Sequence, residues 1–476
     1  MKLSHTLTAT SAVFDDPNLV SSAGLVMALA DAAGLRSLTD ERLTVATDKG
    51  PNAGLKVASL VGGMLAGADS IDDMAVLRHG GMGKIFTSAY APSTLGPFLR
   101  TFTFGHVRQL DAVASRFLAG LAARTPLLNP PAASITATTG GYALVDVDDT
   151  IIEVHGHAKQ GAGLGYSRVR GLNALLASLT TTGRAPVIVA QRLRKGSCGS
   201  PRGAKRLIGD AVTQARRLLP ADQPVLVRAD SAFFGGPSVR AALTGGGADV
   251  SVTVRLTKTI KAAIATIDHD AWTAIEYTDA IRDEATGEWI SRAEVAEIPF
   301  TAFASKKKPE QVTGRLVVRR IPDVNAAKKQ AAGQGTLFDV WRFHAFFTTV
   351  PADRLDTVTA DQTHRHHAII EQVHADLKNS ALAHLPSGRF TANAAWLVLA
   401  VMTFNLTRAA ATLTGTASLA KSTTATIRRT LIAVPARVAS SARRITLHLP
   451  QHWPWQNAWT ELFTLGCGPP AAVART

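Results

Sequence analysis

The chain has 476 residues, 46% of them hydrophobic, and its 51 lysines and arginines against 36 acids give a net charge of +15. This composition excludes wholesale disorder, and only two cysteines, Cys198 and Cys467, exclude a disulfide framework and a cysteine-rich zinc module. The excess of positive charge favours a polyanionic partner, most often nucleic acid. No secretory signal is evident, and the most apolar stretch, residues 394–402, is shorter than the roughly 20 residues that cross a bilayer. We therefore expect a soluble cytoplasmic protein, not a membrane protein.

Residues 1–135 are predicted to form a helical N-terminal region. One helix is expected over Leu19–Leu35, and Ser70 and Asp73 have the spacing of a capping box at the start of another. The basic residues near the end of this region favour a role in DNA binding. Helical packing without any contact to DNA is the alternative.

Residues 140–256 have the pattern of an α/β domain. Three consecutive strands, of which Tyr142–Val154 is the first, precede a helix over Ala204–Leu219. A buried strand over Pro224–Ala229, a second helix and a further strand follow. This is the order of elements in a ribonuclease-H-like sheet, with the first strand at its centre. The glycines of residues 161–165 have the spacing of a nucleotide-binding loop, but no helix opens after them, so we predict a turn beside the strands.

The rest of the chain changes pattern twice. Residues 257–338 are predicted to be a β-rich insertion with exposed lysine runs at 306–308 and 328–329. Residues 339–412 return to the core with a last strand, a helix over Thr363–Lys378 and a buried helix, and residues 413–476 form a C-terminal region. The predicted fold class is thus α/β, with an RNase-H-like catalytic core, a β-rich insertion and a helical N-terminal region.

The C-terminal region carries little regular pattern. Residues 414–430 are predicted to be a linker or a surface helix. Three tryptophans, Trp453, Trp455 and Trp459, are expected to pin this segment to the body of the protein.

Acidic side chains mark three separate segments of the core. Asp146 and Asp148 lie two apart on the first strand, so both project to one face. Asp230 directly follows a buried strand, and Glu371 lies inside the helix after the last strand. Acids within apolar strands are costly unless they are paired or bound to a cation, and Mg²⁺ prefers such oxygen ligands. The pattern predicts a site for divalent cations, and acids that fan into solvent are the alternative.

The helix that carries Glu371 has a polar face. His367, Glu371, His374 and Lys378 recur at helical spacing and share that face, which suits a metal ion and a nearby phosphate. A zinc site made by His367, Glu371 and His374 is one alternative, and a solvated polar face is another.

Two motifs on these segments carry a resemblance to a known family. Over residues 20–410, the chain resembles the DDE transposases of bacterial insertion sequences, in particular those with a β-rich insertion before the catalytic glutamate. Asp148-Asp149-Thr150 is similar to the family's Asp-x-Thr motif. Residues 228–233 are similar to its Arg-Ala-Asp-Ser-x-Phe motif.

The glutamate helix matches the family in part. Glu371 and Lys378 have the family's spacing, but His364 and His367 occupy the positions of its tyrosine and arginine. Arg365 is a hypothetical substitute for the missing charge. The two histidines raise the question of whether the site is active.

The resemblance implies a reaction and its partners. Asp148, Asp230 and Glu371 would bind two Mg²⁺ ions, or Mn²⁺ in their place, with Asp146 as the alternative first ligand. Water would cut the ends of the element, and the freed 3′-hydroxyl would attack target DNA. Lys378 and Arg365 would contact DNA. The implied partners are the terminal inverted repeats, target DNA and a second copy of the chain, in the bacterial cytoplasm at the nucleoid.

Two rival functions remain open from the sequence. One is a transposase-derived DNA-binding protein that no longer cuts, which the histidines favour and the three acids oppose. The other is a metal-dependent nuclease of the same fold that does not transfer strands.

Overall fold

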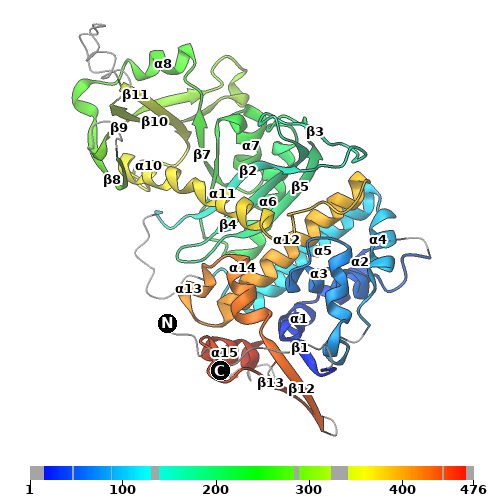
Figure 1. The fold of residues 1–476 in the computed structure, drawn as a ribbon. Coiled ribbons are helices and arrows are strands. Elements are labelled where there is room, and N and C mark those ends of the chain that lie inside the picture. Colours follow the sequence, from blue (N-terminus) through cyan, green and yellow to red (C-terminus); the bar gives the residue numbers. More distant parts are fainter. Residues whose placement is uncertain are drawn as a thin grey trace.

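The structure is a computed structural model that describes residues 16–45, 48–86, 88–129, 139–282, 289–322, 341–441 and 444–467. A group of helices from both ends of the chain lies beside a long mixed sheet (Figure 1). The predicted lysine run at 328–329 lies outside the described residues, whereas Lys306–Lys308 is exposed as predicted.

The N-terminal region is helical, but its first helix is shorter than predicted. The expected helix over Leu19–Leu35 is instead a strand, a helix and a break at Gly34, whose φ of 91° is left-handed. Ser70 and Asp73 do form the predicted capping box, although a 3-10 helix follows it. The elements are β1 (Leu19–Ser21), α1 (Ala23–Ala32), α2 (Leu35–Arg42), α3 (Ala53–Ala66), η1 (Asp72–Arg78), η2 (Gly80–Lys84), α4 (Pro92–Arg100) and α5 (Phe104–Arg124).

The core sheet has the predicted order of elements. Its strands are β2 (Ala143–Glu153), β3 (Gly163–Leu164), β4 (Arg170–Thr180), β5 (Val187–Lys195), β6 (Val225–Ala229) and β7 (Asp249–Val254). Strand β2 lies between β4, which is antiparallel to it, and β6, which is parallel to it, and β7 continues the parallel part. The helices between the later strands are α6 (Ala204–Leu218), η4 (Ser231–Phe233) and α7 (Gly236–Thr244). This arrangement is compatible with an RNase-H-like fold.

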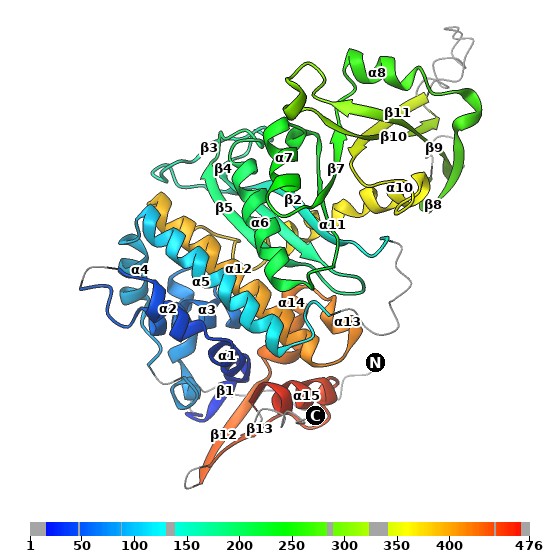
Figure 2. The same cartoon turned by 180° about the vertical axis from the view of Figure 1, so that it is seen from behind.

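The β-rich segment extends the core sheet. Strand β11 pairs with the edge of β7, and β10, β9 and β8 follow in an antiparallel run, as Figure 2 shows from behind. The elements are α8 (Lys258–Ile264), η5 (His269–Ala271), β8 (Thr273–Arg282), β9 (Trp289–Ala302), η6 (Lys308–Glu310), β10 (Val312–Pro322) and β11 (Trp341–Thr348). We propose that residues 257–338 are an insertion into the core domain. Its strands belong to the same sheet as those of the core.

The helix predicted over Thr363–Lys378 is interrupted. It consists of α10 (Thr357–Arg365), η7 (His366–Ala368) and α11 (Ile369–Lys378). The next helix, α12 (Phe390–Leu413), is long and apolar enough to cross a membrane by length and composition, so the apolar segment is longer than residues 394–402 suggest. It is wholly buried within the protein, which makes it a core helix.

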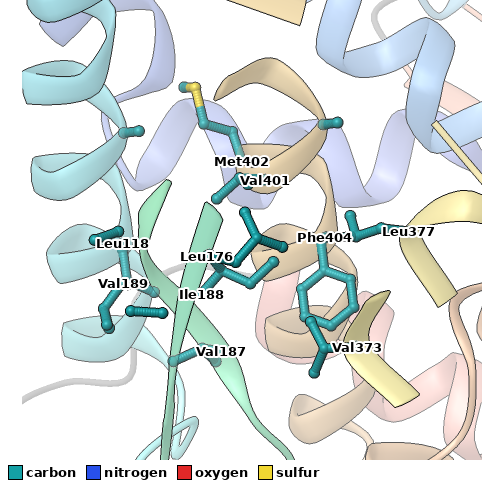
Figure 3. Packing of buried hydrophobic residues seen from close by; sticks show 14 of the residues in the cluster. Leu118, Leu176, Val187, Ile188, Val189, Val373, Leu377, Val401, Met402 and Phe404 are labelled. Atoms are coloured by element: carbon teal, nitrogen blue, oxygen red, sulfur yellow. The ribbon is translucent and has the colours of Figure 1, made fainter. Parts of the chain in front are cut away.

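Helix α12 joins the helical region to the sheet. Its side chains belong to one hydrophobic core with those of α5, β5 and α11. In Figure 3, Phe404 of α12 lies beside Val373 and Leu377 of α11, and Leu118 of α5 lies beside Val189 of β5. Because Val373 and Leu377 face this core, Glu371 is left on the exposed side of α11.

The C-terminal region is more ordered than predicted. Residues 414–430 contain two short helices, each with a buried and an exposed side, which agrees with the surface-helix alternative, and a β-hairpin pairs with β1. Trp453 donates a hydrogen bond to the Thr430 carbonyl at 3.0 Å, and Trp459 is buried, so these two tryptophans do pin the segment. The elements are α13 (Ala417–Ala420), α14 (Thr424–Ile427), η8 (Arg428–Ile432), β12 (Pro435–Ser441), β13 (Arg444–His448) and α15 (Gln456–Cys467).

Candidate active site

The strand register places two of the predicted acids at the same level. Val147 of β2 pairs with Ala229 of the parallel strand β6. Asp148 and Asp230 are the next residues along these two adjoining strands. The pairing of these two strands therefore brings together two carboxylates that are 82 residues apart in the sequence. Asp146 and Arg228, which are also 82 residues apart, are paired in the same way.

Asp146 is fully buried and is contacted by the side chains of Arg228 and His367. Its Oδ1 accepts hydrogen bonds from Arg228 Nε at 2.7 Å, and its Oδ2 accepts one from Arg228 Nη2 at 2.8 Å. The Nδ1 atom of His367 lies 2.9 Å from Oδ1. Burial opposes ionisation, but Arg228 and His367 outweigh it and hold the pKa of Asp146 below its usual value. Asp146 is thus occupied by protein groups.

Asp148 lies on the same face of β2 but has no such partner. Its side chain is 23% exposed, and the Nδ1 atom of His374 lies 3.7 Å from its Oδ2, too far for a strong hydrogen bond. Burial raises the pKa of Asp148 to about 6, and the negative charges of Asp230 and Asp149 add to the rise. Asp148 is therefore a partly buried carboxylate with too little positive charge around it.

Asp230 begins the 3-10 turn that follows β6. Its Oδ1 accepts a hydrogen bond from the Ala232 N–H at 3.0 Å, and Phe233 anchors the turn in the core. The other oxygen of the exposed carboxylate remains available. Although Asp230 is exposed to solvent, partial desolvation of its carboxyl group raises its pKa, as burial does for Asp148. The turn thus holds Asp230 at the end of its strand.

Arg228 interrupts the helix that carries Glu371. Besides binding Asp146, its guanidinium donates hydrogen bonds to the carbonyls of Thr363 and His366. The Thr363 carbonyl would otherwise serve the helical ladder, whereas the His366 carbonyl also accepts a backbone N–H at the end of η7. A side chain inserted at such a point breaks a helix. The interruption at residues 366–368 follows from this contact. It also fixes the start of α11, and so Glu371, against β2.

Two further polar residues of α11, His374 and Lys378, lie on the side of Asp148. His374 is buried, its Nε2 has no hydrogen-bond partner in the structure, and burial lowers its pKa to about 3. Burial also lowers the pKa of Lys378, although the charge of Asp148 opposes that shift. Lys378 thus lies near enough to Asp148 for their charges to interact.

The back of α11 is held by a buried ion pair that the sequence did not indicate. Asp376 accepts hydrogen bonds from Arg408 Nη2 at 2.8 Å and from the Thr424 N–H at 3.0 Å. These contacts join α11 to α12 and α14. A similar buried pair on the other face of β2 joins Asp149 to Arg194 at 2.7 Å.

The two unexpected histidines have structural roles. The ring of His364 stacks on Phe346, with centroids 4.1 Å apart, and its nitrogens lie 2.8 and 2.9 Å from the hydroxyls of Ser251 and Thr253. Burial keeps its pKa well below the usual value, so the ring is neutral. His367 is bound to Asp146. In the described part of the chain, His367, Glu371 and His374 do not form the ligand set of the zinc alternative.

Arg365 is paired within the protein. Its Nε lies 2.9 Å from Oδ2 of the buried Asp361, which also binds Arg319 at 2.8 Å. One carboxylate is therefore shared by two guanidinium groups. Contact between Arg365 and DNA stays a prediction.

Tyr166 lies on the loop between β3 and β4, and its pKa is affected by the charges of all the acids at the site. Partial desolvation of its hydroxyl raises its pKa, and four carboxylates add to the rise, those of Asp149, Asp148, Asp230 and Glu371. The charges of all three predicted acids thus influence the hydroxyl group of Tyr166. The predicted turn at residues 161–165 is confirmed, because β3 lies beside β4 and no helix follows it.

The donor set fits a hard divalent cation. Carboxylate oxygens are the ligands that Mg²⁺ prefers, and the raised pKa values of Asp148 and Asp230 show negative charge that protein groups leave uncompensated. Within the described residues, no three His, Cys, Asp or Glu side chains are close enough together to hold an ion as they lie. The carboxylates must therefore draw together to bind one.

The raised pKa of Asp148 predicts a pH-dependent effect on stability. Above pH 6 the folded protein carries an ionised Asp148 that burial disfavours, whereas below the ordinary pKa of 3.8 it becomes protonated in both folded and unfolded states. Without metal at pH 7.5, Asp148→Asn should raise the melting temperature by about 2–4 °C. The difference from wild type should shrink as the pH falls to 4. A lower melting temperature at pH 7.5 would show that the carboxylate is already compensated.

Comparison with protein families identifies the family of the chain. A family model described as transposase DDE domain group 1 matches residues 11–465, nearly the whole chain. No curated protein matches the chain. The family match covers the sheet, the three acids and both helical regions.

Proposed function

The chain belongs to the transposase DDE domain family, and on this basis we propose that it cuts the ends of a DNA element and joins them to target DNA. The observation that carries the proposal is the placement of the acids. Asp148 and Asp230 follow paired residues on adjoining strands, and the helix of Glu371 is fixed against the same strand by Arg228. We propose these three carboxylates as the ligands of Mg²⁺, with Mn²⁺ as a substitute.

Asp148 is the first ligand in this proposal, and Asp146 is not. Asp146 is already neutralised by Arg228 and His367, so a cation would have to displace an internal ion pair to reach it. Asp148 has an uncompensated charge that a cation would relieve. Asp146 instead positions the strand and the helix start.

The protein groups would hold the DNA strand while the bound ions supply the chemistry. Two divalent ions, when bound, activate the attacking oxygen and stabilise the leaving one. Asp148, Asp230 and Glu371 would provide oxygen ligands from three rigid elements. Lys378, one turn beyond His374, would contact the phosphate next to the cut. The freed 3′-hydroxyl would then attack target DNA.

The charge of the chain supports a DNA substrate. A net charge of +15 supplies affinity that does not depend on base sequence and weakens with salt. We propose terminal inverted repeats and target DNA as the substrates and a dimer on paired ends as the working form. Inverted repeats beside the coding region would support a transposase over a nuclease that does not transfer strands.

The roles of the two histidines weaken the alternative of a protein that binds DNA but does not cut it. That alternative rested on His364 and His367 in place of a tyrosine and an arginine. His364 is a neutral ring packed on Phe346, and His367 compensates the charge of Asp146. Neither blocks Asp148, Asp230 or Glu371.

Lys378 gives a test of phosphate contact. Lys378→Ala should reduce DNA cleavage about tenfold or more with little change in melting temperature, because the half-buried amine neighbours Asp148 and makes no ion pair within 4.0 Å in the described structure. Cleavage rates and thermal unfolding of the same preparations measure the two effects. Lys421→Ala, at the exposed residue that follows α13, is the control and should cleave like wild type. Parallel losses of stability and cleavage in Lys378→Ala would make Lys378 structural.

A further inference from the structure

The loop that carries Tyr166 is a tight hairpin beside the three acids. The Arg168 N–H donates to the Gly165 carbonyl at 3.0 Å, and the Gly165 N–H donates to the Val169 carbonyl at 3.3 Å. Arg168 has a left-handed φ of 60°, as the residue that closes such a turn often does. The turn is therefore braced by its own backbone.

The hairpin is also packed closely on β2. A Cβ atom on Gly165 would lie 2.8 Å from Cδ1 of Ile151, so only glycine allows this approach without a shift. The side chain of Tyr166, in contrast, is 78% exposed. A rigid loop thus presents a large aromatic ring to solvent at the edge of the acidic site.

A cavity of about 400 Å³ lies next to this ring. It is bounded by β2, the hairpin and the C-terminal end of α11. Its walls combine aliphatic side chains with hydroxyl groups, one cation and one carboxylate, that of Glu153, and are formed by Thr150, Ile151, Ile152, Glu153, Tyr166, Ser167, Val169, Lys378, Leu382 and Ala383. Thr150 lies on the same face of β2 as Asp148, so the cavity opens beside the proposed cutting site.

The lining favours a nucleobase over other occupants. A flat, apolar base with polar edges suits the aliphatic walls, the hydroxyls and the exposed ring. Lys378, in the wall towards Asp148, suits the phosphate of the same nucleotide. Proteins that hold single strands combine such an aromatic surface with a positively charged group that follows the backbone.

We propose that the cavity holds one unpaired base of the DNA strand next to the phosphate that is cut, with that base stacked on Tyr166. The inference rests on the proposed function and adds a site for the substrate. It makes Tyr166 a positioning residue that keeps the end of the strand in register with Asp148, Asp230 and Glu371.

The hydroxyl of Tyr166 does not need to react in this proposal. Desolvation and the neighbouring carboxylates raise its pKa, so the phenol is neutral at physiological pH. A neutral phenol is a poor nucleophile. Its ring is the part that serves the substrate.

Fluorescence of a base analogue tests the stacking. The probe is duplex DNA ending in the terminal repeat that flanks the coding region, with 2-aminopurine at each of the last three positions of the cut strand in turn. Ca²⁺ replaces Mg²⁺, and the full-length chain is used. Wild type and Tyr166→Phe should quench the fluorescence at one position. Tyr166→Ala should leave it unquenched there and bind the same DNA about tenfold more weakly.

A second variant on the same hairpin is the control. Leu164→Ala removes another exposed side chain, 64% exposed, that does not line the cavity, and it should behave like wild type. Equal quenching by Tyr166→Ala would overturn the stacking proposal even where DNA is bound and cut. Quenching lost in Tyr166→Phe would overturn it too, since the ring remains. Failure of wild type to bind this DNA would overturn the proposed function and this inference together.

Discussion

Asp230→Asn is expected to abolish metal-dependent DNA cleavage while leaving the fold and DNA binding intact. The amide keeps an oxygen that can accept the hydrogen bond from Ala232, so the turn after β6 should persist. It loses the negative charge that the proposed cation site needs. Loss of one member of a catalytic group commonly costs about 10³-fold or more. Cleavage of a terminal-repeat duplex and binding to the same duplex are the two measurements.

Asp222→Asn is the matched control for this variant. Asp222 lies in an exposed turn just before β6 and should tolerate the change without loss of cleavage. Undiminished cleavage by Asp230→Asn would remove Asp230 from the site. Cleavage lost together with the melting transition would instead indicate a role in folding.

Arg228→Met is expected to have the largest effect on stability. The substitution leaves the buried carboxylate of Asp146 without its bidentate partner and frees the carbonyls of Thr363 and His366. Removing one member of a buried ion pair costs about 3–5 kcal/mol in the free energy of unfolding. Urea denaturation at pH 7.5 measures this loss. Arg240→Met removes a half-exposed pair with Glu310 and should cost about 1 kcal/mol or less.

A double variant separates the two roles of Arg228. Asp146→Leu with Arg228→Met replaces the buried pair by apolar groups and should recover most of the stability. Cleavage should stay reduced, by about 10²-fold, because nothing then fixes the start of α11 beside β2. Wild-type cleavage in the double variant would show that Arg228 only neutralises Asp146.

The order of elements in the core is readable from local patterns. Strand β2 has apolar residues at both ends with acids between them, β6 is mostly apolar, and α6 has one apolar stripe, so the type of each element can be predicted locally. Acids at the ends or in the middle of such runs stand out, which is why Asp148 and Asp230 are visible without a structure. Their side-by-side placement needs only the parallel pairing of β2 with β6.

The features that were missed depend on distant contacts. The break at residues 366–368 is caused by Arg228, which lies 135 residues before Thr363. The role of His364 depends on Phe346 and on hydroxyls of β7. One signal was present in the sequence: Arg228 precedes Asp230 by two residues, as Asp146 precedes Asp148. On paired strands that spacing places Arg228 opposite Asp146.

The structure of the two ends of the chain also depends on distant contacts, so local sequence patterns do not predict it. Residues 414–430 are rich in threonine, alanine and serine, and nothing local predicts that Ile427 and Leu431 pack into the core of another region. Likewise, β1 is a strand because β12 pairs with it from the far end of the chain. The β-propensity of its three residues, Leu19–Ser21, is too weak a signal to predict that pairing.

The central claim is that Asp148, Asp230 and Glu371 cut DNA at the ends of an element with the help of bound divalent ions. The most direct test incubates the purified chain with duplex DNA that carries the terminal repeats from either side of its own coding region. With Mg²⁺, we predict a cut at the repeat end that leaves a 3′-hydroxyl, followed by joining to a target plasmid, and no cut in EDTA. A folded chain that binds these ends with Mg²⁺ present and leaves every strand intact would contradict the account.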